Sequence, residues 1–140
     1  MADHVNPSRE SFARFRAVGR TGPVHMLNLI RLKPQADYED GRPATGAEAY
    51  STYGRESGPI FRALGGRIIW SGRPEVMVIG PDSGEVWDIA FIAEYPSEDA
   101  FVTMIRDPDY QKVTYHRTAA VADSRLIRME PLPAPEGFSA

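Results

Sequence analysis

The segment Pro23–Leu32, PVHMLNLIRL, decides the fold. It is apolar at both odd and even positions, and a strand with that pattern is covered on both of its faces. Val24 and Met26 share one face, whereas Leu27 and Leu29 share the opposite one. A layer of helices on one side of a sheet would leave the second face open. We therefore predict that a second copy of the chain covers it.

Helix and strand signals surround this segment in a regular order. Thr45 and Glu48 form a capping box that opens one helix, and Asn6 followed by Pro7 opens another near the N-terminus. Pro74 confines its strand to a sheet edge or a bulge. We predict helices at residues 6–17, 45–64, 97–106 and 107–122, and strands at residues 23–32, 67–79, 85–95 and 124–129.

After the leading helix, the order is strand, helix, strand, strand, helix, strand. This order predicts the split βαβ arrangement, in which the first and third strands are central and the other two are edges. The fold class is therefore α+β, βαββαβ, with a four-stranded antiparallel sheet and an extra N-terminal helix. We expect the domain to cover residues 23–131, after a helix and lead-in at 1–22 and before a flexible tail at 132–140.

Composition restricts the classes of function. The chain of 140 residues has a net charge of -3 and no cysteine. The absence of cysteine excludes disulfides, thiolate catalysis and cysteine-based metal sites. A weakly acidic surface without a basic stripe does not suit nucleic acid. We find no apolar run that could span a membrane and no signal peptide, so we expect a cytoplasmic protein with no membrane partner.

Five segments together carry a resemblance to a bacterial family. They are MLNLIRLK (26–33), the helix with Tyr50 and Tyr53, GGRIIWSG (65–72), EYPSEDAF (94–101) and DPDYQKVTYHR (107–117). In this order they resemble domain of unknown function 1330, and the resemblance covers residues 23–130. It implies a ferredoxin-like fold of the dimeric α/β-barrel superfamily, in which two sheets face each other as a homodimer. It implies no particular reaction.

Asn28 and Arg117 are the strongest candidates for binding a ligand. Asn28 is an amide within an apolar strand, so it needs a partner, either within the protein or on a ligand carbonyl. Arg117 shares a helical stripe with Tyr110 and should therefore face the sheet. A buried guanidinium needs an anion. A structural salt bridge to Glu94 or Asp88 is the preferred interpretation, and a ligand carboxylate is the alternative.

Four aromatic residues complete the predicted ligand site. Tyr50, Tyr53, Trp70 and Trp87 fall on elements that this topology packs together, so we predict that they line a pocket with Asn28 and Arg117. Their other interpretation is ordinary core packing. The polar loop 33–45 is long enough to be a lid over the pocket, although a solvated loop is the preferred interpretation.

Histidine offers only weak catalytic candidates. His4, His25 and His116 lie far apart in sequence and none has a ligand at metal-binding spacing, so we predict no metal. No glycine-rich phosphate loop follows a strand, and we expect no cofactor. His116 and Asn28 remain weak catalytic candidates.

Two functions of different classes stay open. The first is a cofactor-free enzyme on a small metabolite, in which Asn28 polarises a carbonyl and Arg117 holds an anion. The second is a non-catalytic dimeric domain that senses a ligand or binds a partner. A monooxygenase or a heme-degrading enzyme using Asn28, Trp87 and His116 is a minor alternative within the first.

Overall fold

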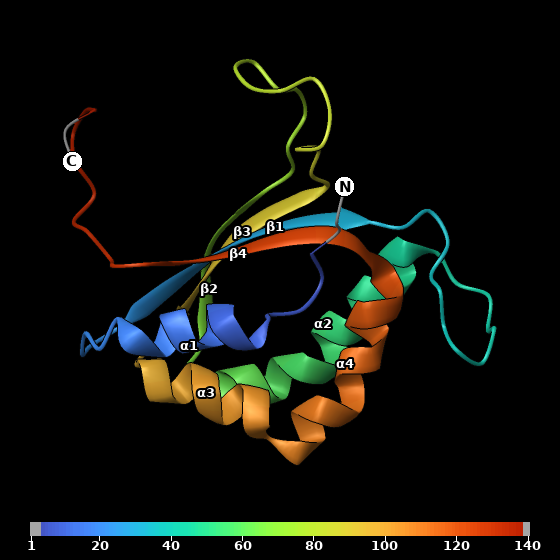
Figure 1. Ribbon diagram of the computed structural model, residues 1–140, viewed down its shortest axis with the longest axis horizontal. Coiled ribbons are helices and arrows are strands. Elements are labelled where there is room, and N and C mark those ends of the chain that lie inside the picture. The colour runs from blue at the N-terminus through green and yellow to red at the C-terminus, as the bar shows by residue number, and fades with distance from the viewer. Residues whose placement is uncertain (1–3, 139–140) are drawn as a thin grey trace.

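The computed structural model describes residues 4–138 and contains one antiparallel sheet with its helices on one face (Figure 1). The elements in chain order are α1 (Arg9–Ala17), β1 (Val24–Leu32), α2 (Gly46–Ala63), β2 (Arg67–Gly72), β3 (Ile89–Tyr95), α3 (Glu98–Arg106), α4 (Pro108–Ala120) and β4 (Val121–Met129). The sheet order is β2-β3-β1-β4, so β1 and β3 are central. This confirms the predicted ferredoxin-like βαββαβ arrangement with an added N-terminal helix.

The helix-facing side of β1 carries the core. Val24, Met26 and Ile30 are 0–3% exposed beneath the helices. Each of these residues pairs with a residue of β3 that also faces the helices. Asn28 lies on the same face of β1 and pairs with Phe91 of β3. Asn28 is only half-buried, although it stands between two buried neighbours. The helices therefore do not close over the middle of the strand.

The opposite face of the sheet has no layer over it. On this face, Leu27 pairs with Ile92 of β3 and Ile127 of β4, and Ile92 in turn pairs with Trp70 of β2. We call these four residues the open-face row. Trp70 is 52% exposed and Ile127 is 47% exposed. The predicted second face of the Pro23–Leu32 strand is thus confirmed as apolar and uncovered within the chain.

The buried core is divided into two separate clusters. The first, here called the Tyr95 cluster, comprises Val24, Met26, Ala93, Tyr95, Phe101, Met104 and Tyr110. The second, here called the Tyr38 cluster, comprises Ile30, Tyr38, Ala49, Ala119, Ala120 and Val121. Phe91 packs against both. Asn28 lies on β1 between the strand residues that belong to each, so the gap between the clusters opens at this position.

Local signals explain most helix ends. The Thr45 hydroxyl accepts a hydrogen bond from the Glu48 N–H at 3.0 Å, and the Glu48 carboxylate accepts one from the Thr45 N–H at 2.8 Å. These two bonds confirm the predicted capping box of α2. The predicted start of α1 at Asn6-Pro7 is wrong. Ser8 is the N-cap, because Ser8 and Ser11 each accept a hydrogen bond from the other's backbone N–H at 3.0 Å. No described side chain of α1 is fully buried, but Phe12 and Phe15 are partly buried against the Tyr95 cluster.

Three strand boundaries also differ from the sequence prediction. The second strand ends at Gly72 rather than Ile79, and the third begins at Ile89 rather than Glu85. Pro74 lacks the N–H that would extend the ladder. The last helix passes directly into β4 at Val121, whose backbone is already extended (φ -94, ψ 124). Residues 121–123 are therefore strand, where helix had been predicted up to 122.

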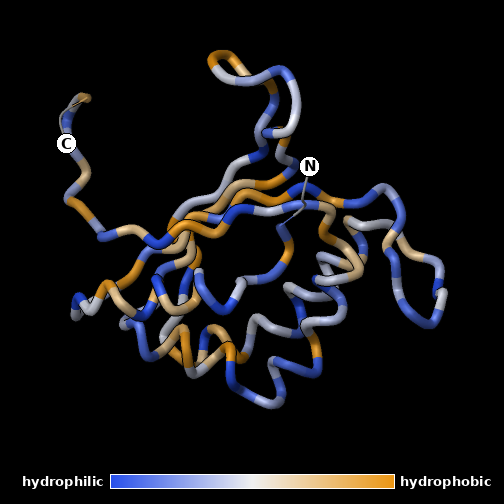
Figure 2. Tube along the Cα trace, in the orientation of Figure 1, coloured by the Kyte–Doolittle hydropathy of each residue, from blue (hydrophilic) through white to orange (hydrophobic). Residues whose placement is uncertain are grey.

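The long β2–β3 connection, residues 73–88, forms an arm that projects from the side of the sheet opposite the helices (Figure 1). Its tip is apolar (Figure 2). Val76 is 79% exposed, Val78 is 86% exposed and Ile79 is 92% exposed. Residues 131–138 leave the sheet as an extended tail. No helix in the described part of the chain is long and apolar enough to cross a membrane.

Candidate functional site

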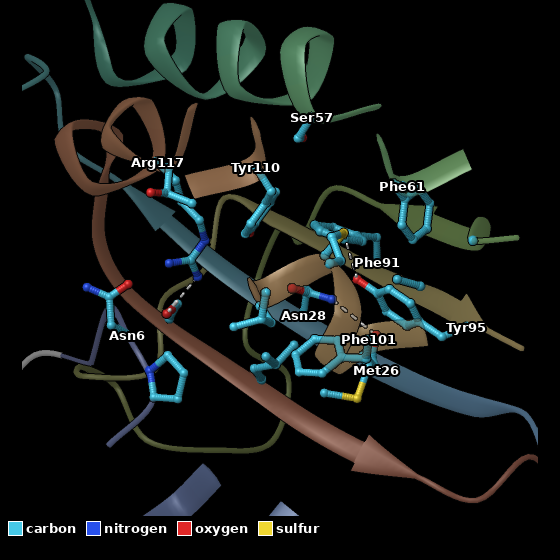
Figure 3. A pocket seen from close by; sticks show the side chains of 18 of the residues that line it. Asn6, Met26, Asn28, Ser57, Phe61, Phe91, Tyr95, Phe101, Tyr110 and Arg117 are labelled. Carbon is cyan, nitrogen blue, oxygen red and sulfur yellow. Dashed lines mark hydrogen bonds between the residues drawn. The ribbon is translucent and has the colours of Figure 1, made fainter. Parts of the chain in front are cut away.

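A cavity of about 1500 Å³ lies against the Tyr95 cluster and extends to Tyr50 and Phe91, which pack at the edge of the Tyr38 cluster. Its floor is the helix-facing side of the sheet, and residues of α1, α2, α3 and α4 form its walls (Figure 3). Arg117 enters it from α4, Asn28 from β1 and Phe101 from α3. Small-molecule pockets usually measure about 300–1,000 Å³. The volume is therefore ample for a metabolite.

The Arg117 guanidinium lies in this cavity, and none of the described residues is an acidic partner for it. Its Nη1 donates to the carbonyl oxygen of Val5 at 2.5 Å, and its Nη2 donates to Ser124 Oγ at 3.4 Å. Among residues 4–138, no carboxylate forms an ion pair with it. Carbonyl and hydroxyl dipoles satisfy two donors but leave the positive charge uncompensated.

The salt bridge expected for Arg117 is therefore wrong. Glu94 lies on the open face of the sheet, where it pairs with His25 at 2.8 Å and Arg67 at 2.7 Å. Asp88 accepts a hydrogen bond from the Leu32 N–H at 2.7 Å, beyond the end of the cavity. Strand alternation explains the error for Glu94, because its neighbours Ala93 and Tyr95 face the helices.

The charged side chains that line the cavity are all arginines in the described chain, although Arg67, Arg125 and Arg128 pair with acidic residues outside the lining. In a chain with 19 acidic and 16 basic residues, no Asp or Glu of the described residues lines it. Six arginines do: Arg14, Arg62, Arg67, Arg117, Arg125 and Arg128. Such a distribution favours an anionic occupant.

Three tyrosines stand beside Arg117 on the helical side. The Tyr53 and Tyr110 hydroxyls lie 2.6 Å apart. Burial raises the pKa of Tyr50 to about 12, against a smaller lowering by the charge of Arg117. Burial also raises the pKa of Tyr53 well above its usual value, and Tyr110 adds to the rise. The Tyr50 and Tyr53 hydroxyls therefore stay protonated at neutral pH, and the Tyr50 hydroxyl can donate to a ligand.

Asn28 contributes an amide to the cavity floor. Its Nδ2 donates to the backbone carbonyl of Met26 at 3.1 Å, within its own strand. No bond to its Oδ1 is made by the described residues. The amide can therefore accept a hydrogen bond from a molecule in the cavity.

The family model for a domain of unknown function (DUF1330) matches residues 43–130. This chain belongs to the DUF1330 family. It is similar to the RPA0582 protein of Rhodopseudomonas palustris, a protein of unknown function. One crystal structure of RPA0582, of the methylated protein, is 59% identical with a TM-score of 0.89, covering 95% of this chain and 98% of that one. The other is 57% identical with a TM-score of 0.88, covering 95% and 100%.

More distant structures resemble the DUF1330 protein in fold alone. An uncharacterised NIPSNAP-like domain protein from Burkholderia xenovorans is 14% identical with a TM-score of 0.53, covering 84% of this chain and 89% of that one. A dabb family protein with a ferredoxin-like fold from Mesorhizobium loti is 16% identical with a TM-score of 0.50, covering 80% and 99%. No match is found among curated proteins.

In this DUF1330 protein, four of the six predicted ligand-binding residues line the cavity: Asn28, Tyr50, Tyr53 and Arg117. The two tryptophans lie elsewhere. Trp70 stands in the open-face row, and Trp87 is buried beneath Arg125, whose guanidinium lies 5.0 Å from its ring centre. Trp87 precedes the start of β3, so the strand alternation that predicted its direction does not apply.

His116 also lies outside the cavity lining. It is 3% exposed, its Nδ1 lies 2.7 Å from the Tyr38 hydroxyl, and its Nε2 lies 3.5 Å from Glu56 Oε1. The structure therefore does not bring Asn28, Trp87 and His116 into one site. Loop 33–45, the candidate lid, is held against α4 by Tyr38 and lines no part of this cavity.

Sequence reasoning missed the residues that close the ends of the cavity. Ser124 holds the Arg117 guanidinium and also donates to the carbonyl of His4 at 2.7 Å. Arg128 lies on an edge strand of the sheet, but its side chain is only 9% exposed. The sequence signal for this placement was its position four residues after Ser124 on the same strand. Strand residues two or four positions apart share a face, so Arg128 faces the helices as Ser124 does.

Proposed function

We propose that this protein binds an apolar small molecule through a carboxylate, in the cavity between the sheet and the helices. The observation that carries the proposal is the Arg117 guanidinium, which faces the cavity and has no acidic partner or carboxylate lining beside it among residues 4–138. A planar guanidinium matches a carboxylate with two parallel hydrogen bonds. Aromatic and aliphatic walls suit the rest of the ligand.

The lining supports binding more than acid–base catalysis. Tyr50 and Tyr53 are donors whose pKa values are raised, so they do not act as bases near neutral pH. His4 is the single histidine of the lining as described, and it is exposed. The catalytic hypothesis, with Asn28 polarising a carbonyl, stays a prediction without a base to accompany it.

A carboxylate screen tests the proposal directly. Isothermal titration calorimetry and thermal shift are measured with linear and phenyl-substituted monocarboxylates on the wild type and on Arg117→Met. Methionine retains the packing of the stem and removes the charge. We expect affinity to fall by at least about tenfold, since hydrogen bonds to charged groups contribute about 1.5–3 kcal/mol.

Arg106→Met is the matched control, because Arg106 is exposed, ends α3 and does not line the cavity. It should bind as the wild type does. The melting temperature of Arg117→Met should fall moderately, because the Val5 carbonyl loses its donor while no carboxylate of the described residues loses a partner. Absence of binding by any monocarboxylate, together with a large loss of stability in Arg117→Met, would reject the proposal in favour of a structural role.

We further propose that the open face of the sheet pairs with a second copy of the chain. The open-face row crosses all four strands and leaves Trp70 and Ile127 about half exposed. The same patch on both copies makes a self-complementary two-fold contact. The arm projects on the same side of the sheet, so its apolar tip is available to the partner (Figure 1).

Substitutions at two adjacent residues of β4, Leu126 and Ile127, test this dimer contact. Ile127→Asp places a charge on the open face, whereas Leu126→Asp places it on the opposite face of the same strand. Light scattering should give twice 15.5 kDa for the wild type and Leu126→Asp, and 15.5 kDa for Ile127→Asp. A monomeric wild type at micromolar concentration would contradict the homodimer.

A further inference from the structure

A second arginine closes the end of the cavity away from Arg117. Arg128 faces the helices opposite Met26, and its side chain is 9% exposed. Its Nη1 donates to the carbonyl of Phe15 at 2.7 Å and to Glu98 Oε1 at 2.7 Å. Its Nε and Nη2 are buried and have no hydrogen-bond partner among the described residues. Buried donors without partners are rare in native proteins and call for a ligand or an ion.

The charge at this end is also incompletely compensated. Glu98 is shared, because its Oε2 lies 3.1 Å from Arg16 Nε while its Oε1 accepts from Arg128. Two guanidinium groups therefore face one carboxylate. The Arg128 guanidinium lies 4.6 Å from the centre of the Phe15 ring, which disperses some charge but accepts no in-plane hydrogen bond. A net positive charge and two free donors remain.

The geometry of β4 sets the separation of the two ends. Ser124, which contacts Arg117 at 3.4 Å, and Arg128 are four residues apart on one face of the strand. At about 3.3 Å per residue, their Cα atoms are about 13 Å apart. Leu126 stands between them on the same face and is paired with Asn28 on the cavity floor. The surface between the two arginines is therefore mainly apolar.

We infer that the ligand is an elongated apolar molecule with an acidic group at each end, one on Arg117 and the other on Arg128. This inference rests on the proposed function and narrows it from carboxylates in general to the dicarboxylate class. A monocarboxylate would satisfy Arg117 but leave the two free donors of Arg128 unpaired. A second acidic group at the matching distance accepts from both of them. A chain that is too short or too long reaches one arginine only.

The test compares linear diacids from adipate to dodecanedioate with monoacids of the same chain length, by calorimetry on the full chain. We expect one diacid length to bind about tenfold or more tightly than its monoacid, as two charge-assisted hydrogen bonds allow. Arg128→Met should remove this preference, because diacid affinity should fall by a larger factor than monoacid affinity. Arg117→Met should weaken both ligands, and Arg106→Met should change neither.

Two further variants test the inference if Arg128→Met fails to fold. Arg128→Lys retains a cation for Glu98 but lacks the planar fork, so the diacid preference should shrink while the fold persists. Glu98→Gln removes the internal competitor, so the preference for the diacid should increase. Equal affinity for diacids and monoacids at every length would overturn this inference while the proposed function stands. Failure of both classes to bind would overturn the two together.

Discussion

Asp123 Oδ1 accepts a hydrogen bond of 2.8 Å from the backbone N–H of His4, 119 positions earlier in the chain. Ser124 and Arg117 hold the carbonyls of His4 and Val5 beside it. Three residues around the start of β4 therefore fix the N-terminal segment across one end of the cavity. The segment precedes α1, whose Phe12 and Phe15 pack against the Tyr95 cluster, and these polar contacts anchor the chain at the other end of the segment.

Asp123→Asn should release that anchor and lower stability in a pH-dependent way. Burial acts to raise the pKa of Asp123, but hydrogen bonds from His4, Arg125 and Ser124 lower it below its usual value of 3.8. A lowered pKa in the folded state gives stability that is present above 3.8 and is lost as pH falls through the folded value. We expect a loss of about 1–3 kcal/mol at neutral pH.

Urea unfolding from neutral to acidic pH measures this effect, and limited proteolysis before α1 reports on the anchor. The wild type and Asp123→Asn should converge as the pH approaches the folded pKa. A constant difference at all pH values would show that the ionised form of Asp123 has no special role.

His116→Ala should lower stability without changing ligand affinity. The Tyr38 hydroxyl lies 2.7 Å from His116 Nδ1, and both residues are buried. Removing the ring leaves the hydroxyl unpaired and creates a cavity, so we expect a loss of about 2–4 kcal/mol. Tyr38→Phe removes only the hydrogen bond and should cost about 1 kcal/mol. Unfolding and calorimetry measure the two quantities. A loss of carboxylate binding would return His116 to the candidate site.

Tyr50→Phe should make the protein less sensitive to alkali. Burial raises the pKa of Tyr50 from 10.0 to about 12. A group whose acid form is favoured by folding stabilises the protein below its unfolded pKa, and that contribution is lost as pH rises through the folded one. Stability of the wild type should therefore decline above pH 10.0, and less steeply in Tyr50→Phe. Unfolding midpoints at increasing pH check the slope, and identical slopes would contradict the assignment.

Serine at Val76, Val78 and Ile79 should weaken the homodimer and leave the protomer folded. These side chains are 79–92% exposed within the chain, so they contribute nothing to its own core. Burial against a partner stabilises by about 1.5–3 kcal/mol for each aliphatic side chain that is fully covered. We expect the dimer dissociation constant to rise by at least about tenfold in analytical ultracentrifugation.

Asp82→Ser is the control for the arm, because it changes an exposed polar residue of the same loop. It should dimerise as the wild type does. An unchanged dissociation constant in the triple variant would place the arm outside the interface.

The sequence by itself determined the fold class and the faces of the central strand. The alternation in Pro23–Leu32 separates Leu27 from Met26 by simple strand geometry, and the Thr45–Glu48 capping box depends on residues three apart. Both are local properties, so they can be inferred without knowing what packs against them. The same reasoning was wrong at Asn6, because Ser8 and Ser11 offered a competing local cap.

Tertiary structure alone decided the site. Strand alternation places Glu94 on the open face, where it pairs with His25 and Arg67, so the expected salt bridge to Arg117 does not form. The division of the core into two clusters depends on which distant residues pack together, which no local pattern encodes. The contacts of Arg117 with Val5 and Ser124 join residues distant in sequence. Their partners are set by the three-dimensional path of the chain, because hydrogen bonds of this kind require proximity that only the complete fold provides.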